Sequence, residues 1–550
     1  MPFDALDRLQ KNGKRAAEVA AVLAKYGLAD GLRWLDVDWI QDRLRSRDGV
    51  KLHDQPLATR IRLALGDLGT TFIKLGQVLS TRPDLVGAEL ATELARLQAR
   101  TTPDPPEVAR ATLVAELGRP PEALFATYEP AAFASASIAQ VHGARLHDGR
   151  EVVVKILRAD VRQRAEADLE LLEAVARLAE RHATWLRPYQ PVAVARHFRR
   201  TLRRELDFTY ERRNLDTFAA RFAGDATVHF PASVPELSTR SVLTMERLDG
   251  IAAADVSALR ASGCDLAEFA RRGASMWLAM IFRDSVYHAD PHPGNLLLLP
   301  GTVVGVLDCG MVGRIDSGLR QQVEALLFAA VEQDAAELAE IVLRLGKAPI
   351  DTDRAALTTE LDEFLADYIG HSLHDLDVGA ALQSLFDLVR RYHIVLPAPL
   401  SLLLRTLLVL DGTSRALDRD FSLAELIEPF YVQALRRRAS PRALLRRLRR
   451  TWRDWDRLLD AAPRDLRDVL GRLRDGSLRM RLEHGHLDAV LNRLTLGILV
   501  AALVLGGSAL WASAAPPRLG GVSVPAVVLY LLAIRLGWRL LRAIRRSGEL

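Results

Sequence analysis

The residues best suited to chemistry lie in a short Pro/Gly-rich segment, residues 287–295, and directly after the next predicted strand. Asp290 and Asn295 share the segment, and Asp308 follows the strand, one hairpin away. Two cation-binding side chains beside a carboxylate that can accept a hydroxyl proton are what magnesium-dependent phosphoryl transfer requires. Magnesium is held by one or two carboxylates or amides together with nucleotide phosphates. The pattern therefore predicts a site for Mg2+ and a nucleotide.

Two other interpretations of this segment stay open at this point. His288 and His292 could bind a transition metal, although a zinc site has no use for Asn295 and the pattern offers no clear third histidine. The segment could also be a plain Pro/Gly turn with a helix-capping aspartate.

A second group of residues precedes the first along the chain. Small side chains lead into a predicted strand, and Lys155 emerges from the apolar return strand after a turn at Asp148-Gly149. A loop of small residues lets the backbone approach a phosphate closely. An unpaired ammonium in an apolar strand is costly, so Lys155 should face a carboxylate or a phosphate, although a surface lysine with its stem on apolar side chains fits as well. The loop residues are Ala134, Ser135, Ala136, Ser137 and Ile138.

Composition places limits on the whole chain. It has 550 residues, 49% of them hydrophobic and 26% charged, which predicts two to four globular domains and argues against a mainly disordered protein. Two cysteines exclude a disulfide framework. The net charge is +5, from 74 basic and 69 acidic residues, so the basic excess matters only where it clusters. Only seven of the basic residues are lysines, so a lysine inside a motif indicates that the site requires a lysine and not simply a positive charge.

The C-terminal part has the pattern of a membrane anchor. Residues 494–515 are apolar or small, about the ~20 residues that span a hydrocarbon core. Pro516-Pro517 then breaks the pattern, and a shorter apolar run covers residues 519–534. Arginines on both outer flanks predict a transmembrane helical hairpin in the inner (cytoplasmic) membrane, with both ends and the catalytic domain on the cytoplasmic side. The N-terminus has no secretory signal pattern and is expected to form an amphipathic helix.

An arginine-rich stretch, residues 436–481, precedes this anchor and interleaves Trp452 and Trp455 with leucines. A basic amphipathic helix next to a bilayer is expected to contact anionic membrane lipids, and tethering to a membrane disfavours a nucleic-acid partner. A solvated helix face is the alternative.

The remaining pattern predicts an α+β fold. Strands are expected at residues 138–146, 152–157, 242–245, 296–299 and 303–307, and helices over 157–220, 265–287 and 318–435. Glu205, Asp207 and Glu211 would then lie near one face of a helix, where three carboxylates invite a cation such as lysine or magnesium. Neighbouring arginines could neutralise them instead.

The order of these motifs resembles the protein kinases: a lysine strand, an acidic helix, an Asp-x-x-x-x-Asn loop and an Asp-x-Gly after a strand. Two departures, the Ala/Ser-rich loop and Asp308-Cys309-Gly310, make the sequence resemble the UbiB (AarF-type) family of atypical kinase-like proteins associated with coenzyme Q biosynthesis. Further matches are the Lys-x-Gly-Gln motif at Lys74 to Gln77 and the Glu-x-Asp element at Glu205 to Asp207.

This resemblance implies roles for the matching residues. Lys155 would bind nucleotide phosphates and pair with Glu211, Asp290 would take the catalytic-base position, and Asn295 and Asp308 would hold magnesium. The hinge that receives adenine would include Met245, Glu246 and Leu248. The extension with Lys74 and Gln77 would fold over the active site near Glu205 and Asp207, which would obstruct a protein substrate.

The prediction is therefore a membrane-anchored, Mg-ATP-dependent kinase-like ATPase that supports ubiquinone or other isoprenoid quinone biosynthesis. A protein or small-molecule kinase and a non-catalytic nucleotide-binding scaffold are the alternatives. Expected partners are quinone precursors or quinone-biosynthesis proteins, with a possible homodimer. The expected two-lobed fold divides into a helical extension, a small lobe, a helical lobe, a basic segment and a transmembrane hairpin with a basic tail, at residues 1–120, 121–245, 246–435, 436–493 and 494–550.

Overall fold

The computed structural model describes residues 13–28, 55–97, 102–346, 348–349, 352–369, 377–438, 487–513, 516–519 and 522–545. The chain forms two compact units that divide between Ser440 and Pro441. The first unit holds three sheets and most of the helices, and the second holds two long helices with a two-stranded sheet. The greater part of the predicted basic segment, residues 439–486, lies outside the described residues. The other predicted domain boundaries stay predictions.

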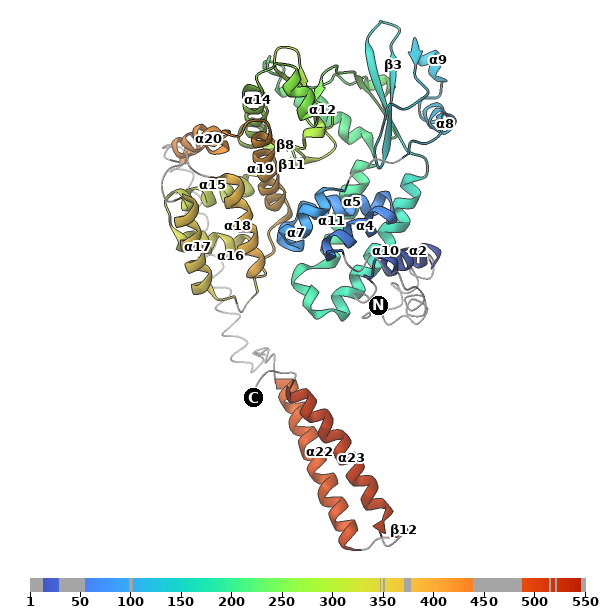
Figure 1. Cartoon of the computed structure of the whole chain (residues 1–550), viewed down its shortest axis with the longest axis vertical. Helices are drawn as coiled ribbons and strands as arrows, with labels where there is room; N and C mark the ends of the chain where they lie inside the picture. The colour runs from blue at the N-terminus through green and yellow to red at the C-terminus, as the bar shows by residue number, and fades with distance from the viewer. Residues whose placement is uncertain are drawn as a thin grey trace, which may run out of the picture. The chain divides into compact units, whose positions relative to one another are not determined.

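An antiparallel five-stranded sheet carries the lysine strand (Figure 1). The strand order is β1-β3-β4-β6, and β2 pairs with β3. The β3–β4 turn confirms the predicted hairpin: Gly149 has φ +92°, a left-handed conformation that glycine adopts without strain. The strands are β1 Thr127–Tyr128, β2 Ala134–Ser135, β3 Ala139–Arg145, β4 Glu151–Leu157 and β6 Val242–Glu246.

Strand β4 is covered on both faces, which explains its nearly continuous apolar sequence. Side chains alternate across a strand, so Val152, Val154 and Ile156 share one face and pack with residues of α8 (Pro106–Leu117) and α9 (Pro121–Leu124). Val153 and Leu157 belong to the large central core. Lys155 shares their face, and the strand therefore points its ammonium group toward the central core.

The stretch predicted as helical over residues 157–220 is interrupted. It contains α10 Val161–His182, the short helix η2 Thr184–Tyr189, α11 Pro191–Glu205 and α12 Phe208–Arg221. Asp207 has extended backbone angles, and its carboxylate caps α12 by accepting a hydrogen bond from the Thr209 N–H (3.1 Å). The expectation that Glu205, Asp207 and Glu211 share one helix is wrong, because this cap ends one helix and begins the next.

Two small sheets follow and confirm the predicted strands near the Asp-x-x-x-x-Asn segment. One has the order β5-β10-β9-β7, and β8 pairs with β11 in the other. Their bounds are β5 Val228–His229, β7 Ile251–Ala252, β8 Val286–His288, β9 Leu296–Leu299, β10 Val303–Val306 and β11 Val312–Arg314, with the short helix η5 Pro293–Asn295 before β9.

The N-terminal helices pack on α10 and α11 and on one another. Gly76 in α5 lets the Leu97 side chain, just after α7, approach closely, because an added Cβ there would overlap it. The helices are α2 Gly13–Lys25, α4 Leu57–Leu68, α5 Thr70–Ser80, α6 Pro83–Val86 and α7 Ala88–Ala95. The predicted N-terminal amphipathic helix thus corresponds in part to α2.

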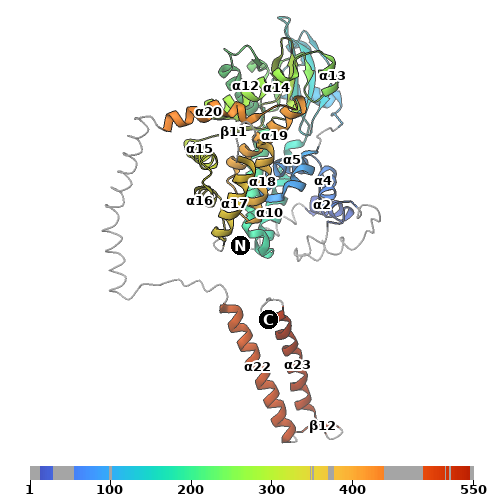
Figure 2. The ribbon, with the colours of Figure 1, turned by 60° about the vertical axis from the view of Figure 1, so that its left-hand side comes forward.

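The rest of the first unit is helical, as predicted for residues 265–287 and 318–435. Helices α14 and α19 pack against each other (Figures 1 and 2), and Trp277 of α14 is completely buried. The helices are η3 Pro235–Leu237, α13 Val256–Ala261, α14 Leu266–Leu278, the π-helix η4 Ala279–Asp284, α15 Ser317–Val331, α16 Ala335–Leu345, α17 Arg354–Ile369, α18 Val378–Arg391, α19 Ala398–Leu417 and α20 Leu423–Arg438.

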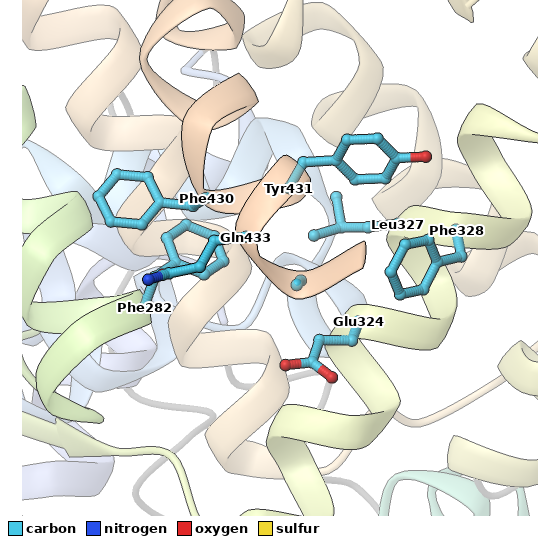
Figure 3. Close-up of a pocket in the computed structure, with 8 residues that line it drawn as sticks. Phe282, Glu324, Leu327, Phe328, Phe430, Tyr431 and Gln433 are labelled. Carbon is cyan, nitrogen blue, oxygen red and sulfur yellow. The ribbon is translucent and has the colours of Figure 1, made fainter. Parts of the chain in front are cut away.

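A pocket in this helical part lies between η4, α15 and α20 (Figure 3). The rings of Phe282 and Phe430 stack 5.2 Å apart on one side, and Phe328 and Tyr431 approach to 5.4 Å on the other. Its lining includes none of the residues predicted for the nucleotide site.

The second unit pairs α22 Leu487–Ala512 with α23 Val524–Arg545, and Ser508 and Tyr530 hydrogen-bond between them. Strands β12 Arg518–Leu519 and β13 Val522–Ser523 connect the helices, so the second helix begins at Val524 and not at the predicted residue 519. Among the described residues, one helical stretch, Thr495–Ala512, is long and apolar enough to cross a membrane, judged by length and composition. The apolar part of α23, Val524–Trp538, is shorter.

Candidate active site

Three elements bring Lys155, Glu211 and Asp308 together. The Lys155 Nζ from β4 lies 2.7 Å from Glu211 Oε1 on α12 and 3.0 Å from Asp308 Oδ2 after β10. The ammonium also lies over the Phe208 ring, 5.6 Å from its centroid. Asp308 accepts a hydrogen bond from the Gly310 N–H (2.7 Å), which fixes its carboxylate. The lysine strand, the acidic helix and the Asp-x-Gly turn therefore form one cluster.

Two carboxylates compete for one ammonium in this cluster, and their pKa values separate. Burial raises the pKa of Glu211 to about 7, and the negative Asp308 adds to this effect while Lys155 opposes it. Burial alone would also raise the pKa of Asp308, but Lys155 and the Gly310 N–H lower it below its usual range. The two carboxylates outweigh the burial of Lys155 and raise its pKa. Near neutral pH, Lys155 and Asp308 are ionised and Glu211 takes up a proton readily.

His288 joins the Asp290 segment to Asp308. Its Nδ1 accepts a hydrogen bond from the Asp290 N–H (3.0 Å), so its Nε2 carries the proton that it donates to the Asp308 carbonyl oxygen. Asn295 donates through Nδ2 to Asp290 Oδ2 (2.9 Å) and to the Asp290 carbonyl (3.2 Å). These bonds hold Asp290, Asn295 and Asp308 in a fixed arrangement.

This geometry argues against the transition-metal interpretation. Both ring nitrogens of His288 are occupied within the protein, and His292 Nδ1 accepts a hydrogen bond from the Gly294 N–H (3.0 Å). Among the residues that the structure describes, no group of three or more His, Cys, Asp or Glu side chains could hold a metal ion. A magnesium ion bound to nucleotide phosphates differs from such a cluster, because it needs only one or two ligands from the protein.

The N-terminal extension places Lys74 beside the same acidic groups. Lys74 Nζ on α5 lies 2.8 Å from Glu205 Oε2 at the end of α11. Burial alone would lower the pKa of Lys74, but Glu205, Asp308 and Asp290 raise it. The structure does not bring Asp207 to Lys74: the Asp207 carboxylate binds Thr209 and Arg240.

Gln77, the last residue of the Lys-x-Gly-Gln motif, also points away from the acidic cluster. Its Nε2 donates to the Leu97 carbonyl (3.2 Å), which joins α5 to the end of α7. At the start of α5, the Thr70 hydroxyl donates to the Ser137 carbonyl (2.9 Å). The extension therefore contacts the small-residue loop directly.

That loop is compact. Ala134 and Ser135 form β2, the Ala136 N–H donates to the Ala139 carbonyl (2.8 Å), and Ser137 and Ile138 are buried. The hydroxyl oxygen of Ser135 is buried and has no hydrogen-bond partner among the residues that the structure describes.

The predicted hinge lies at the end of β6. Met245 is buried, while the Glu246 carboxylate accepts hydrogen bonds from His229 Nε2 (3.1 Å) and the Ala232 N–H (3.0 Å). The backbone N–H groups of Glu246 and Arg247 donate to the carbonyls of Ala232 and Glu151. The Glu246 carboxylate therefore ties the end of β6 to the segment around His229 and Ala232, and its predicted role in the hinge stays a prediction.

Sequence reasoning missed Arg405 on α19. Its half-buried guanidinium donates from Nε to the Ser80 carbonyl (2.6 Å) and is close enough to Asp290 for the two charges to interact. Burial lowers the pKa of Arg405. No sequence motif marks this arginine, because one among many arginines in a helix far along the chain gives no local signal.

The number of negative charges at the site depends on Glu211. Four carboxylates face three cationic groups, so the charges balance while Glu211 is protonated, and its ionisation near pH 7 leaves one negative charge that a divalent cation would neutralise. Asp308 has 40% of its side chain exposed and Asn295 keeps its amide oxygen for a ligand, so both fit a magnesium ion. The groups counted are Glu205, Glu211, Asp290 and Asp308 against Lys74, Lys155 and Arg405.

The fold and this cluster define a kinase-like protein. Residues 96–342 match the ABC1 atypical kinase-like domain, residues 361–422 the UbiB helical domain, and residues 481–546 the ABC1/UbiB kinase-like C-terminal domain. A Vibrio vulnificus protein named "Probable protein kinase UbiB" is 32% identical over 474 residues, which cover 83% of this chain and 86% of the relative.

A Pseudomonas paraeruginosa protein of the same name is 36% identical over 391 residues, covering 70% of this chain and 73% of the relative. A solved structure of a Mycobacterium tuberculosis protein with erythromycin is 25% identical, covers 66% of this chain and 93% of its own, and superposes with a TM-score of 0.42. The chain belongs to the UbiB family of atypical kinase-like proteins, as its sequence motifs predicted.

Proposed function

We propose that this protein is a membrane-anchored, Mg-ATP-dependent atypical kinase-like ATPase that supports ubiquinone or other isoprenoid quinone biosynthesis. The observation that carries the nucleotide part is Lys155, held between Glu211 and Asp308 at 2.7 and 3.0 Å. This is the pairing that positions a lysine for nucleotide phosphates in kinases. The quinone part follows from the resemblance to the UbiB family.

In this proposal the nucleotide binds between a small lobe around the five-stranded sheet and a helical lobe. Lys155 binds its phosphates beneath the small-residue loop, residues 134–138. Adenine meets Met245, and because two hinge N–H groups are used within the protein, the amide of Leu248 is the group we assign to the base. Asp308 and Asn295 hold Mg2+, which neutralises charge on the phosphate oxygens.

Asp290 is the proposed catalytic base. It would accept the proton of the attacking hydroxyl or water, and its hydrogen bond from Asn295 fixes the carboxylate for this task. The position of α5 favours water or a small acceptor, because Lys74 lies beside Glu205 and within the field of Asp290 and Asp308. A protein kinase is the second candidate, favoured by the printed names of the relatives.

The second unit supports the proposed membrane anchoring. Ile498, Leu505, Leu531 and Ile534 expose 63%, 71%, 62% and 67% of their surface in the paired helices, a pattern that suits lipid contact. We propose that the pair forms a transmembrane hairpin in the inner membrane with the first unit on the cytoplasmic side. Proposed partners are anionic lipids, quinone precursors or quinone-biosynthesis proteins, and a second copy of the chain.

The test is Mg2+-dependent ATP turnover by the purified full chain, with and without anionic liposomes, beside Asp308→Asn. We expect turnover that needs Mg2+ and is lost by about 100-fold or more in Asp308→Asn, because the variant loses the negative ligand. Labelled phosphate found on an added protein, and not as free phosphate, would replace the ATPase with the kinase. Nucleotide binding without turnover would contradict both.

A further inference from the structure

A cluster of cationic side chains on α11 is used neither by the core nor by the nucleotide site. Helix α11 turns by about 100° per residue, so Arg196, His197, Arg200 and Arg204 lie on one side of it. Phe198 and Leu202 are each 1% exposed and face the core on the other side. The side chains of Arg196, Arg200 and Arg204 are exposed and cationic, and the His197 imidazole lies among them.

Helix α12 extends this surface. The Arg204 guanidinium lies 6.0 Å from the centroid of the Tyr210 ring, which is 44% exposed. Arg213 follows Tyr210 by three residues and is therefore on the same side of α12. We call Arg196, His197, Arg200, Arg204, Tyr210 and Arg213 together the α11 basic face.

The neighbouring acidic residues neutralise only one edge of this face. Glu173 and Glu166 on α10 pair with Arg199 and Arg203, which flank the face, and Glu173 also lies 4.0 Å from Arg196. Within the described part of the chain, Arg200, Arg204 and Arg213 have no carboxylate within 4.0 Å. Asp84 is bound to Arg82, and Asp207 to Arg240.

The potential at this face is therefore positive. Partial burial lowers the pKa of His197, and three guanidiniums, on Arg200, Arg82 and Arg204, lower it further. Like charges this close repel and destabilise the folded chain, so an external anion would relieve a cost that the protein carries. Guanidiniums bind phosphate oxygens especially well, since their planar donors match phosphate geometry.

We propose that the α11 basic face docks on the anionic phosphate headgroups of the membrane surface. Three features of the molecule favour a bilayer over a free phosphate ligand. The cationic groups spread over two helices, an exposed tyrosine lies among them as at membrane interfaces, and the same chain carries an apolar helix of membrane-spanning length. Because the anchor tethers the protein to the bilayer, the lipid headgroups present the highest local concentration of phosphate groups to this face. This docking rests on the membrane anchoring in the proposed function and is separate from nucleotide chemistry.

The test separates docking from anchoring. The full chain is inserted in nanodiscs of neutral phosphatidylcholine, so that its apolar helices are already covered, and is mixed with sucrose-loaded vesicles without nucleotide. The vesicles contain either phosphatidylcholine alone or 30% phosphatidylglycerol, and co-sedimentation is measured. Failure of the chain to enter nanodiscs would refute the anchoring itself, and ATP turnover is measured apart.

We expect sedimentation with the anionic vesicles only, and at least a roughly 30-fold weaker affinity in Arg200→Glu/Arg204→Glu. Arg260→Glu/Arg419→Glu is the matched control, because both arginines are exposed, lie outside the α11 basic face and change the net charge equally. It should sediment like the unchanged protein. Equal sedimentation of the two double variants would overturn the proposal.

Two further arms test the source of the anion. Inorganic phosphate, or a short single-stranded RNA, is added at the same concentration of phosphate groups as the exposed lipid. Neither should displace the protein from anionic vesicles. Displacement by phosphate would assign the face to a free anion, and displacement by RNA would assign it to a nucleic acid; either result would overturn membrane docking.

Discussion

Glu211 offers the sharpest test of the charge arrangement at the site. Its carboxylate is 7% exposed, shares the Lys155 ammonium with Asp308, and has a pKa raised from 4.5 to about 7. Each pKa unit corresponds to about 1.36 kcal/mol, so ionised Glu211 costs the folded state roughly 3 kcal/mol. Because the folded-state pKa is the higher one, this group's contribution to stability is complete below about pH 4.5 and is lost as the pH rises through about 7.

The assay is an infrared pH titration of the nucleotide-free full chain, in which the protonated-carboxyl band of Glu211 is isolated by subtracting Glu211→Gln. We expect a midpoint near pH 7. The neighbours should shift it in opposite directions: Asp308→Asn lowers the midpoint because a repelling charge is gone, and Lys155→Met raises it because an attracting charge is gone. Mg2+ with a nucleotide analogue should also lower it.

A Glu211 midpoint below pH 5 in the unchanged protein would refute this reasoning, since Lys155 would then belong to Glu211 and not to both carboxylates. Shifts of the same sign in Asp308→Asn and Lys155→Met would refute it as well. Unfolding of a variant is recognised separately by the loss of its folded-state circular dichroism.

Two further predictions concern the extension. Lys74→Met should destabilise the first unit by about 3 kcal/mol, because Glu205 is left buried without its cation, and the double variant Lys74→Met/Glu205→Leu should regain most of that loss. Thermal unfolding of the unchanged protein and the two variants measures both effects. A cost below about 1 kcal/mol for Lys74→Met would contradict a buried ion pair. Gly76→Ala should cost about 1–3 kcal/mol because its Cβ overlaps Leu97. Gly66→Ala in α4 is the control, because its added Cβ meets nothing within 4 Å and alanine favours the helix, so this variant should be more stable by up to ~1 kcal/mol. Equal shifts of the melting temperature in the two glycine variants would contradict the close packing of Gly76 against Leu97.

The sequence by itself determined the elements that carry the site. Two apolar runs and an Asp-Gly turn between them located the Lys155 hairpin, and the strands around Asp290, Asn295 and Asp308 followed from short apolar runs between turn residues. These features depend only on neighbouring residues, so they can be identified from the sequence without knowledge of the fold. The break at Asp207 was missed because the helical periodicity continued across it, while a capping bond to Thr209 decided the local backbone.

Only the tertiary structure decided which charges meet. Lys155 lies between Glu211 and Asp308, and Lys74 reaches Glu205 and not Asp207. Arg405 is close enough to Asp290 for their charges to interact. Each of these arrangements joins elements that are tens to hundreds of residues apart in the sequence. Burial likewise sets the pKa of Glu211, because removal from water is a property of the packed molecule. Residue types along a chain specify local periodicity and turn chemistry, whereas the distance between two charges and the water between them exist only once the chain has folded.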